Sequence, residues 1–169
     1  MKTLLIMRHA KSNWDDASLA DFDRPLNDRG LRTAPFMGEL MTSRDIRPDL
    51  VIGSPAKRAM QTALLVKDSA GLNCPIQFNE RIYEASPLTL HGVVSELSDE
   101  YSSVLLVGHN PGMEGFIRYL TGRIEPMPTA ALAVIELDAE SWSDLTGETG
   151  RLTAIYRPKD EMKVSEIAL

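Results

Sequence analysis

The sequence predicts an α/β protein, a three-layer α/β/α sandwich around a mostly parallel sheet. Short apolar runs rich in branched residues alternate with amphipathic segments of helical spacing, the pattern of strand–helix–strand units. Two of the chain's three histidines, His9 and His109, come directly after such runs. Because ligands of open α/β folds bind at the carboxyl ends of the strands, we expect a functional site there.

The expected strands cover residues 2–7, 49–52, 74–78, 103–107, 131–137 and 152–156. The last two follow each other without an intervening helix, so an antiparallel edge is expected late in the chain. The polar segment 138–150 between them is expected to be a hairpin or a surface loop.

The expected helices are marked by their capping residues. Asn27 is expected to cap a helix that runs toward Met41 and is broken or restarted at Pro35, because proline cannot donate the helical hydrogen bond. Ser54 is expected to cap a second helix, with Pro55 at its first position and Gly71 at its end. Two further helices are expected at residues 87–97 and 112–120.

Length and composition indicate one domain, residues 1–169, of an ordinary globular protein. Hydrophobic residues make up 43% and charged residues 25% of the chain. The net charge of −6 argues against nucleic acid or an anionic membrane as partner. No apolar run is long enough for a membrane span or a signal peptide. The single Cys74 excludes an internal disulfide, and together these features predict a cytoplasmic protein.

Arg8-His9 follows the first expected strand and carries the first candidate chemistry. A histidine nucleophile has to be neutral and held in one tautomer, and an adjacent arginine favours the neutral ring while offering a forked donor to phosphate oxygens. Taken alone, the pair also fits an ordinary strand end at the surface.

Arg58 and His109 extend this pattern. Arg58 falls in the first turn of the helix after the second strand, where the helix dipole and free N–H groups favour an anion. His109 lies in a glycine-rich segment that leads into another helix. Each residue alone also fits a structural role, a solvated arginine or a buried histidine. Together with Arg8 and His9 they supply a nucleophile and positive donors for phosphoryl transfer.

These segments resemble the histidine phosphatase superfamily, the phosphoglycerate-mutase-like group, and in detail its small SixA-type phosphohistidine phosphatases. The matching stretches are residues 5–12, 24–30, 54–63 and 107–112, which occur in family order. The resemblance implies the histidine-phosphatase fold, transient phosphorylation of His9, and a phosphoryl group held by Arg8, Arg58 and His109. It implies no metal and no organic cofactor. Ala10 lies where the wider superfamily usually has glycine, so the additional Cβ atom has to fit at this position.

For the general acid, the resemblance leaves two candidate residues. Residues 79–83 resemble the mutase segment that carries this acid, which indicates Glu80, with Glu84 as the competitor. Both also fit surface carboxylates. Arg24 and Ser12 are further candidates for phosphate contact, although Arg24 also fits a pair with Asp21 or Asp23. His91 falls in an expected helix, away from the site.

About 20 residues separate Tyr83 from Val104, where cap insertions occur in related mutases and phosphatases. Without a cap we expect a shallow, open site, which suits a phosphohistidine side chain presented by a phosphorelay or phosphotransfer protein, with phosphate as product. A phosphatase of small phosphate esters or anhydrides is the alternative. A phosphate-binding module without turnover is a third hypothesis, and it leaves the nucleophile unexplained.

Overall fold

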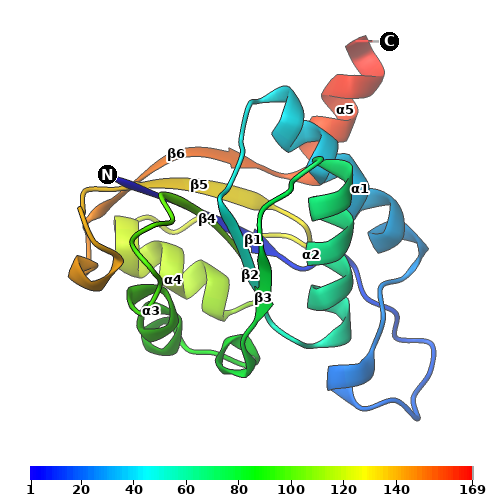
Figure 1. Ribbon diagram of the computed structural model, residues 1–169. Helices are drawn as coiled ribbons and strands as arrows, with labels where there is room; N and C mark the ends of the chain where they lie inside the picture. The colour runs from blue at the N-terminus through cyan, green and yellow to red at the C-terminus, as the bar shows by residue number, and fades with distance from the viewer. Residues whose placement is uncertain (169) are drawn as a thin grey trace.

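Within the described residues 1–168 of the computed structural model, six strands form one sheet in the order β3-β2-β4-β1-β5-β6. Figure 1 shows this sheet with helices on both of its faces. The strands are β1 Lys2–Arg8, β2 Leu50–Gly53, β3 Ile76–Phe78, β4 Ser103–Gly108, β5 Leu132–Leu137 and β6 Gly150–Tyr156. The expected α/β fold with a mostly parallel sheet is confirmed.

The first four strands of this order run parallel to one another. β5 pairs antiparallel with β1, and β6 pairs antiparallel with β5. β4 pairs with both β1 and β2, so the carboxyl ends of these three strands lie side by side. In the β1–β4 register Arg8 stands opposite Gly108, and the segments that follow both strands therefore leave the sheet next to each other.

Helices cover the two faces of the sheet, and the strands bury alternate side chains toward each face. Leu4, Ile6 and Leu106 pack toward α3 and α4, whereas Leu5 and Val107 pack toward α1 and α2. The helices are α1 Asp28–Ser43, α2 Lys57–Ser69, α3 Pro87–Ser95, α4 Gly112–Thr121 and α5 Pro158–Ala168. Single 3-10 turns are η1 Asp21–Asp23, η2 Glu80–Ile82 and η3 Trp142–Asp144.

Pro35 does not break the first helix, contrary to the expectation from sequence. α1 begins after Asn27, whose side chain accepts a hydrogen bond from the Gly30 N–H, and runs through Pro35 to Ser43. A proline inside a helix costs about 3 kcal/mol because one hydrogen bond is lost. Here Met37 and Met41 are fully buried beyond the proline, and this packing offsets the cost.

Ser54 is not the N-cap of α2, and Pro55 is not its first residue. Ala56 is the N-cap, in an extended conformation, and Lys57 begins the helix. The Ser54 hydroxyl accepts from the Ala56 N–H at 3.2 Å and lies 2.7 Å from the ring of His109. The N-cap of the helix therefore lies two residues later than predicted, and the Ser54 hydroxyl contacts the ring of His109. Its end at Gly71, with φ +64°, agrees with the prediction.

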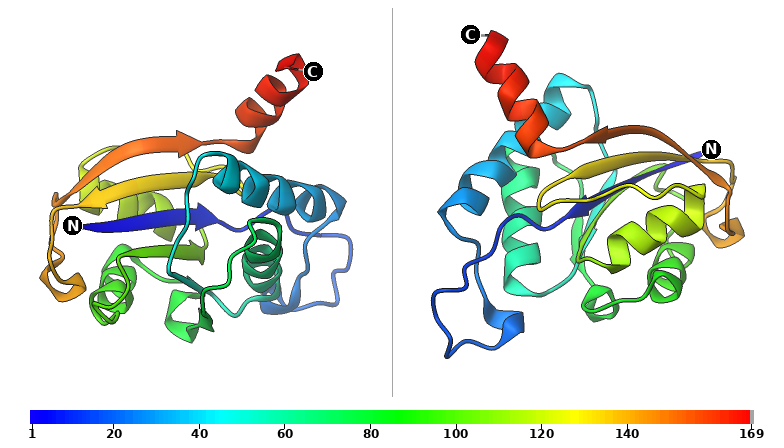
Figure 2. Two further views of the ribbon diagram at one scale, coloured as in Figure 1. Left: turned by 45° about the horizontal axis from the view of Figure 1, so that its top comes forward. Right: turned by 180° about the vertical axis from the view of Figure 1, so that it is seen from behind.

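The connection between β5 and β6 is more than a surface loop. It contains η3, whose Trp142 is fully buried and donates through Nε1 to the Tyr101 carbonyl at 2.8 Å. α5 follows β6 and was not expected from the sequence; Figure 2 shows it extending away from the sheet. Among the described residues, no helix has the length and apolar character needed to cross a bilayer.

Candidate active site

Three segments meet at the carboxyl edge of the sheet. His9 follows β1, Arg58 lies in the first turn of α2 after β2, and His109 follows β4. The His9 N–H donates to the Gly108 carbonyl at 3.0 Å, and the His9 and His109 rings have centroids 5.1 Å apart. The topology thus brings together the histidines that the sequence singled out.

His9 is held in one tautomer. Its Nδ1 lies 2.7 Å from the carbonyl oxygen of Ala10, and because a carbonyl only accepts, Nδ1 carries the proton. The Nε2 atom is then left with a free lone pair. The side chain is only 7% exposed, and this burial lowers the pKa of His9 to about 3, with positive neighbours adding to the effect. The ring is therefore neutral near pH 7, as a nitrogen nucleophile requires.

Ala10 is fully buried, and its N–H donates to the Thr62 hydroxyl at 2.9 Å. Thr62 in turn donates to the carbonyl of Arg58. The β1 and α2 segments of the site are thus tied together one residue beyond the histidine, and the Cβ of Ala10 fits within the core.

His109 is also neutral. Burial lowers its pKa to about 4, and the charge of Arg58 lowers it as well. Ser54 is fully buried, and its hydroxyl accepts the Ala56 N–H; within the described chain the acceptor in reach of its proton is the Nε2 atom of His109. This arrangement puts the His109 proton on Nδ1. The sequence reasoning assigned Ser54 to helix capping and did not place it in the site.

Both arginines are held by backbone carbonyls. Arg58 donates from Nη1 to the Asp21 carbonyl at 2.7 Å and from Nη2 to the Asp21 carboxylate at 3.0 Å. Arg8 donates to the Met127 carbonyl at 3.2 Å, and burial lowers its pKa. In the part of the chain that the structure describes, Arg8 Nε, Arg58 Nε and His109 Nδ1 are buried without a hydrogen-bond partner.

Asp21 links the two sides of the site. Its carboxylate accepts from Tyr83 at 2.6 Å and pairs with Arg24 at 2.8 Å, in addition to Arg58. The Tyr83 hydroxyl, together with these arginines, holds the pKa of Asp21 well below its usual range. The same hydrogen bond raises the pKa of Tyr83 to about 12. Asp21 is thus a carboxylate within the arginine cluster.

Arg24 and Ser12, two predicted phosphate contacts, bond to each other at 2.8 Å. Arg24 also stacks on the Trp14 ring, 3.4 Å from its centroid. Arg24 and Ser12 lie outside the lining of the cavity beside His109, as Arg8 and His9 do, and Arg24 pairs with Asp21, the alternative that the sequence offered. His91 lies outside this cavity and contacts the Leu145 carbonyl.

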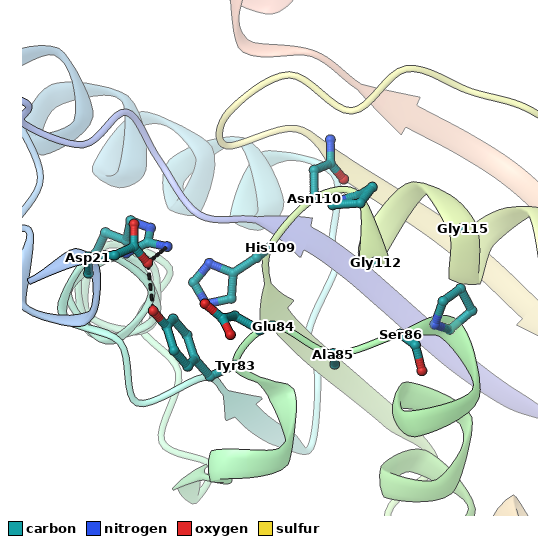
Figure 3. Close-up of a pocket in the computed structure, with 12 residues that line it drawn as sticks. Asp21, Tyr83, Glu84, Ala85, Ser86, His109, Asn110, Gly112 and Gly115 are labelled. Atoms are coloured by element: carbon teal, nitrogen blue, oxygen red, sulfur yellow. Dashed lines mark hydrogen bonds and ion pairs between the residues drawn. The ribbon is translucent and has the colours of Figure 1, made fainter.

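A cavity of about 750 Å³ opens beside His109 (Figure 3). Asp21, Tyr83 and His109 lie at one end of it, with the Glu84 side chain beside His109, and Ser86, Gly112 and Gly115 lie at the other end. Its volume falls in the range of small-molecule sites.

The two candidate acids are separated by the structure. Both side chains are exposed; Glu80 begins η2 and does not line the cavity, whereas Glu84 does. Glu84 has a left-handed backbone conformation, φ 55°. Such conformations are uncommon for residues other than glycine and cluster at functional sites. The segment is not a continuous helix, so the two side chains do not share a face.

No three His, Cys, Asp or Glu side chains are grouped as a metal site in the described residues. The groups present in the site are neutral imidazoles and guanidinium donors, which suit a phosphoryl group rather than a cation.

Comparison with known proteins supports this interpretation. The histidine phosphatase superfamily (branch 1) matches residues 4–105. The uncharacterised protein MT1313 of Mycobacterium tuberculosis (strain CDC 1551 / Oshkosh) is 32% identical over 164 residues, 90% of this chain and all of MT1313.

Solved structures agree with the sequence match. A candidate phosphohistidine phosphatase SixA from Agrobacterium tumefaciens has a TM-score of 0.80 at 29% identity, over 93% of this chain and 98% of that one. The protein histidine phosphatase SixA complexed with tungstate has a TM-score of 0.81 at 24% identity, over 94% and 99%. The chain belongs to the histidine phosphatase superfamily, branch 1, and is a phosphatase whose fold is similar to that of SixA structures.

Proposed function

We propose that the protein hydrolyses its substrate through a phosphohistidine intermediate on His9. The Nε2 lone pair attacks phosphorus, an N–P bond forms, and the bond between phosphorus and the leaving group breaks. Water then attacks phosphorus, the bond to His9 breaks, and phosphate is released. Arg8, Arg58 and His109 donate to the phosphoryl oxygens in both steps.

The observation that carries this proposal is the set of unpartnered buried nitrogens. Arg8 Nε, Arg58 Nε and His109 Nδ1 come from three segments, and all three residues lie close enough to the neutral His9 to lower its pKa electrostatically. Buried donors in folded proteins nearly always have a partner, and a bound ion is one explanation where they do not. A tetrahedral oxyanion next to His9 supplies acceptors for all three.

For phosphate esters we propose Glu84 as the general acid in place of Glu80. The leaving alkoxide needs a proton, and Glu84 lines the cavity with its side chain beside His109. Glu80 is exposed outside the cavity, so it does not reach a leaving group there. An imidazole leaving group requires less help, because it leaves as a weaker base than an alkoxide.

We propose phosphohistidine on a phosphorelay or phosphotransfer protein as the substrate. Between Tyr83 and Val104 the chain forms α3 and no larger cap, which keeps the cavity accessible to a side chain of another protein. The similarity to SixA proteins supports the same substrate class. Small phosphate esters are the second candidate, favoured by the cavity volume of about 750 Å³.

The decisive comparison is kcat/KM for a phosphotransfer protein, phosphorylated on histidine with phosphoramidate, against a panel of small phosphate monoesters. We expect the phosphoprotein to exceed every ester by at least about tenfold, which is about 1.4 kcal/mol of transition-state stabilisation. An ester that equals or exceeds the phosphoprotein would transfer the assignment to the second candidate. Absence of turnover on all of them would contradict the catalytic proposal.

A further inference from the structure

The half of the cavity away from His109 is built to accept a leaving group. We call this the outer half; it is lined by Ala85, Ser86, Pro87, Pro111, Gly112 and Gly115. These residues offer short apolar side chains, glycine backbone and one hydroxyl. A cavity of about 750 Å³ is far larger than a phosphate ion, so the outer half has room for a ring.

The walls of the outer half are packed closely together. A Cβ atom added at Gly112 would collide with the Ala85 carbonyl oxygen, and one added at Gly115 would lie 2.7 Å from Cγ of Pro87. Ser86 caps α3 by accepting from the Thr89 N–H at 3.2 Å. The segment that carries Glu84 is thus fixed against α4 on its C-terminal side, and on the other side Tyr83 is bonded to Asp21.

The charges along the cavity are unequal at its two ends. In the described part of the chain, Arg58 is the one lysine or arginine that lines the cavity, and it is bonded to Asp21. Glu84 lines the cavity next to Ala85, its side chain lies beside His109 in Figure 3, and no hydrogen bond or ion pair joins it to the side chains described. A ligand in the outer half therefore meets a carboxylate and no cation.

We infer that the outer half is a subsite for a neutral or positively charged ring, and that the Glu84 carboxylate, before it takes up the proton that it gives to a leaving alkoxide, disfavours leaving groups that carry a second anionic group. The imidazole of a phosphohistidine side chain is a ring of the accepted class. Phosphomonoesters with a further carboxylate or phosphate belong to the disfavoured class. The inference rests on the proposed function for the position of the phosphoryl group at the His109 end.

Binding of phosphonates tests this charge preference without turnover, because their C–P bond is not hydrolysed. The probes are phenylphosphonates that carry a meta carboxylate, carboxamide or trimethylammonium group. We expect the native protein to bind the carboxamide and trimethylammonium probes at least about tenfold more tightly than the carboxylate probe, since two carboxylates a few ångströms apart near a protein surface repel each other.

Glu84→Gln should reduce the ratio of Kd values between carboxylate and trimethylammonium probes at least about fivefold, by removing both repulsion and attraction. Glu80→Gln is the matched control: it removes the same charge four residues earlier, outside the cavity, and should leave the ratio unchanged. Circular dichroism of both variants checks that they are folded.

Equal affinity of the native protein for the three probes would overturn the inference, as would a Glu84→Gln ratio no lower than that of Glu80→Gln. Failure of all three probes to bind would contradict the oxyanion site itself. If the charge order holds while phosphohistidine protein is not hydrolysed, the subsite stands and the proposed substrate does not.

Discussion

At the scale of single residues, the site depends on two histidines that stay neutral while surrounded by positive charge. His9 and His109 are both more than nine-tenths buried, with Arg8 and Arg58 close enough to lower both pKa values. The hydrogen bond that His9 donates to the Ala10 carbonyl, and the one that His109 accepts from the Ser54 hydroxyl, fix their tautomers. In the proposed mechanism the His9 ring attacks without a base to deprotonate it, and the arginines supply positive charge at the phosphoryl oxygens.

Arg58→Ala should lower kcat with an aryl phosphate by about 10²–10³-fold, the usual effect of removing one donor to a transition-state oxyanion. Arg58→Lys should restore little, because a lysine lacks the planar fork. Lys57→Ala is the control, since Lys57 is exposed on the same turn of α2. A kcat for Arg58→Ala within a few-fold of native would remove Arg58 from the phosphoryl site.

Glu84→Gln should slow hydrolysis of an alkyl phosphate by about 10²-fold or more, the lower range for loss of a general acid. Its effect on phosphohistidine should be smaller, because imidazole is the better leaving group. Steady-state kinetics on both substrates, with Glu80→Gln alongside, measures the difference. Equal losses on the two substrates would mean that the leaving group does not decide the need for an acid.

The site residues at strand ends could be predicted from the sequence. The segments that follow neighbouring parallel strands leave the sheet at the same carboxyl edge, so histidines directly after two such strands lie close together. The positions of three other residues in the site could not be predicted in this way: Ser54, Asp21 and Tyr83. They reach the site through turns whose direction depends on tertiary contacts, such as the hydrogen bond of Tyr83 to Asp21 across 62 residues. Ser54 did carry a signal, since it directly follows β2 at the same edge of the sheet.

At the scale of helices and strands, the sequence predicts most elements to within two residues. The main error about an element is the break expected at Pro35. The stability of α1 comes from tertiary packing, which the local sequence pattern does not show. α5 was missed although Pro158 at its start and Asp160 and Glu161 in its first turn are recognised helix-start signals.

The contact between α1 and α2 depends on Gly38. A Cβ atom at this position would overlap the Ser69 hydroxyl and lie 2.7 Å from the Val66 carbonyl oxygen. Gly38→Ala should therefore destabilise the fold by about 1–3 kcal/mol, the usual cost of overpacking, despite the better helix propensity of alanine. Urea denaturation measures the change. Glu39→Ala, on the exposed face of the same helix, should stay within about 0.5 kcal/mol of native; an equal effect of both would show that the helices do not meet closely at Gly38.

At the scale of the whole molecule, the site joins the two cores that cover the two faces of the sheet. α2 positions Arg58 on one face and α4 follows His109 on the other. The sequence predicts this three-layer plan because both faces of each central strand are apolar. It does not predict the cavity, whose size depends on how the 83–87 segment packs against α4.

Burial of two neutral histidines links the global stability to pH. Their folded pKa values, about 3 and 4, lie below the ordinary 6.5, so between these limits the unfolded chain binds more protons. Stability is then complete above about pH 6.5 and falls as the pH drops toward 4, by about 1.4 kcal/mol per pH unit for each histidine.

His109→Asn should reduce this slope by the contribution of one histidine, because asparagine does not titrate. Urea denaturation of both proteins at several pH values between about 4.5 and 7.5 gives the slopes. Parallel pH profiles for native and variant proteins would show that His109 does not take up a proton on unfolding.

The central claim, that His9 carries the phosphoryl group during turnover, is tested most directly by trapping the intermediate. The protein is mixed with a phosphohistidine protein or an aryl phosphate, quenched in alkali and digested, and the phosphorylated peptide is sequenced by mass spectrometry. We predict an acid-labile phosphoryl group on His9, formed and lost at rates compatible with turnover and absent from His9→Ala, which should be inactive. A phosphoryl group on another residue, or native turnover by His9→Ala, would contradict the account.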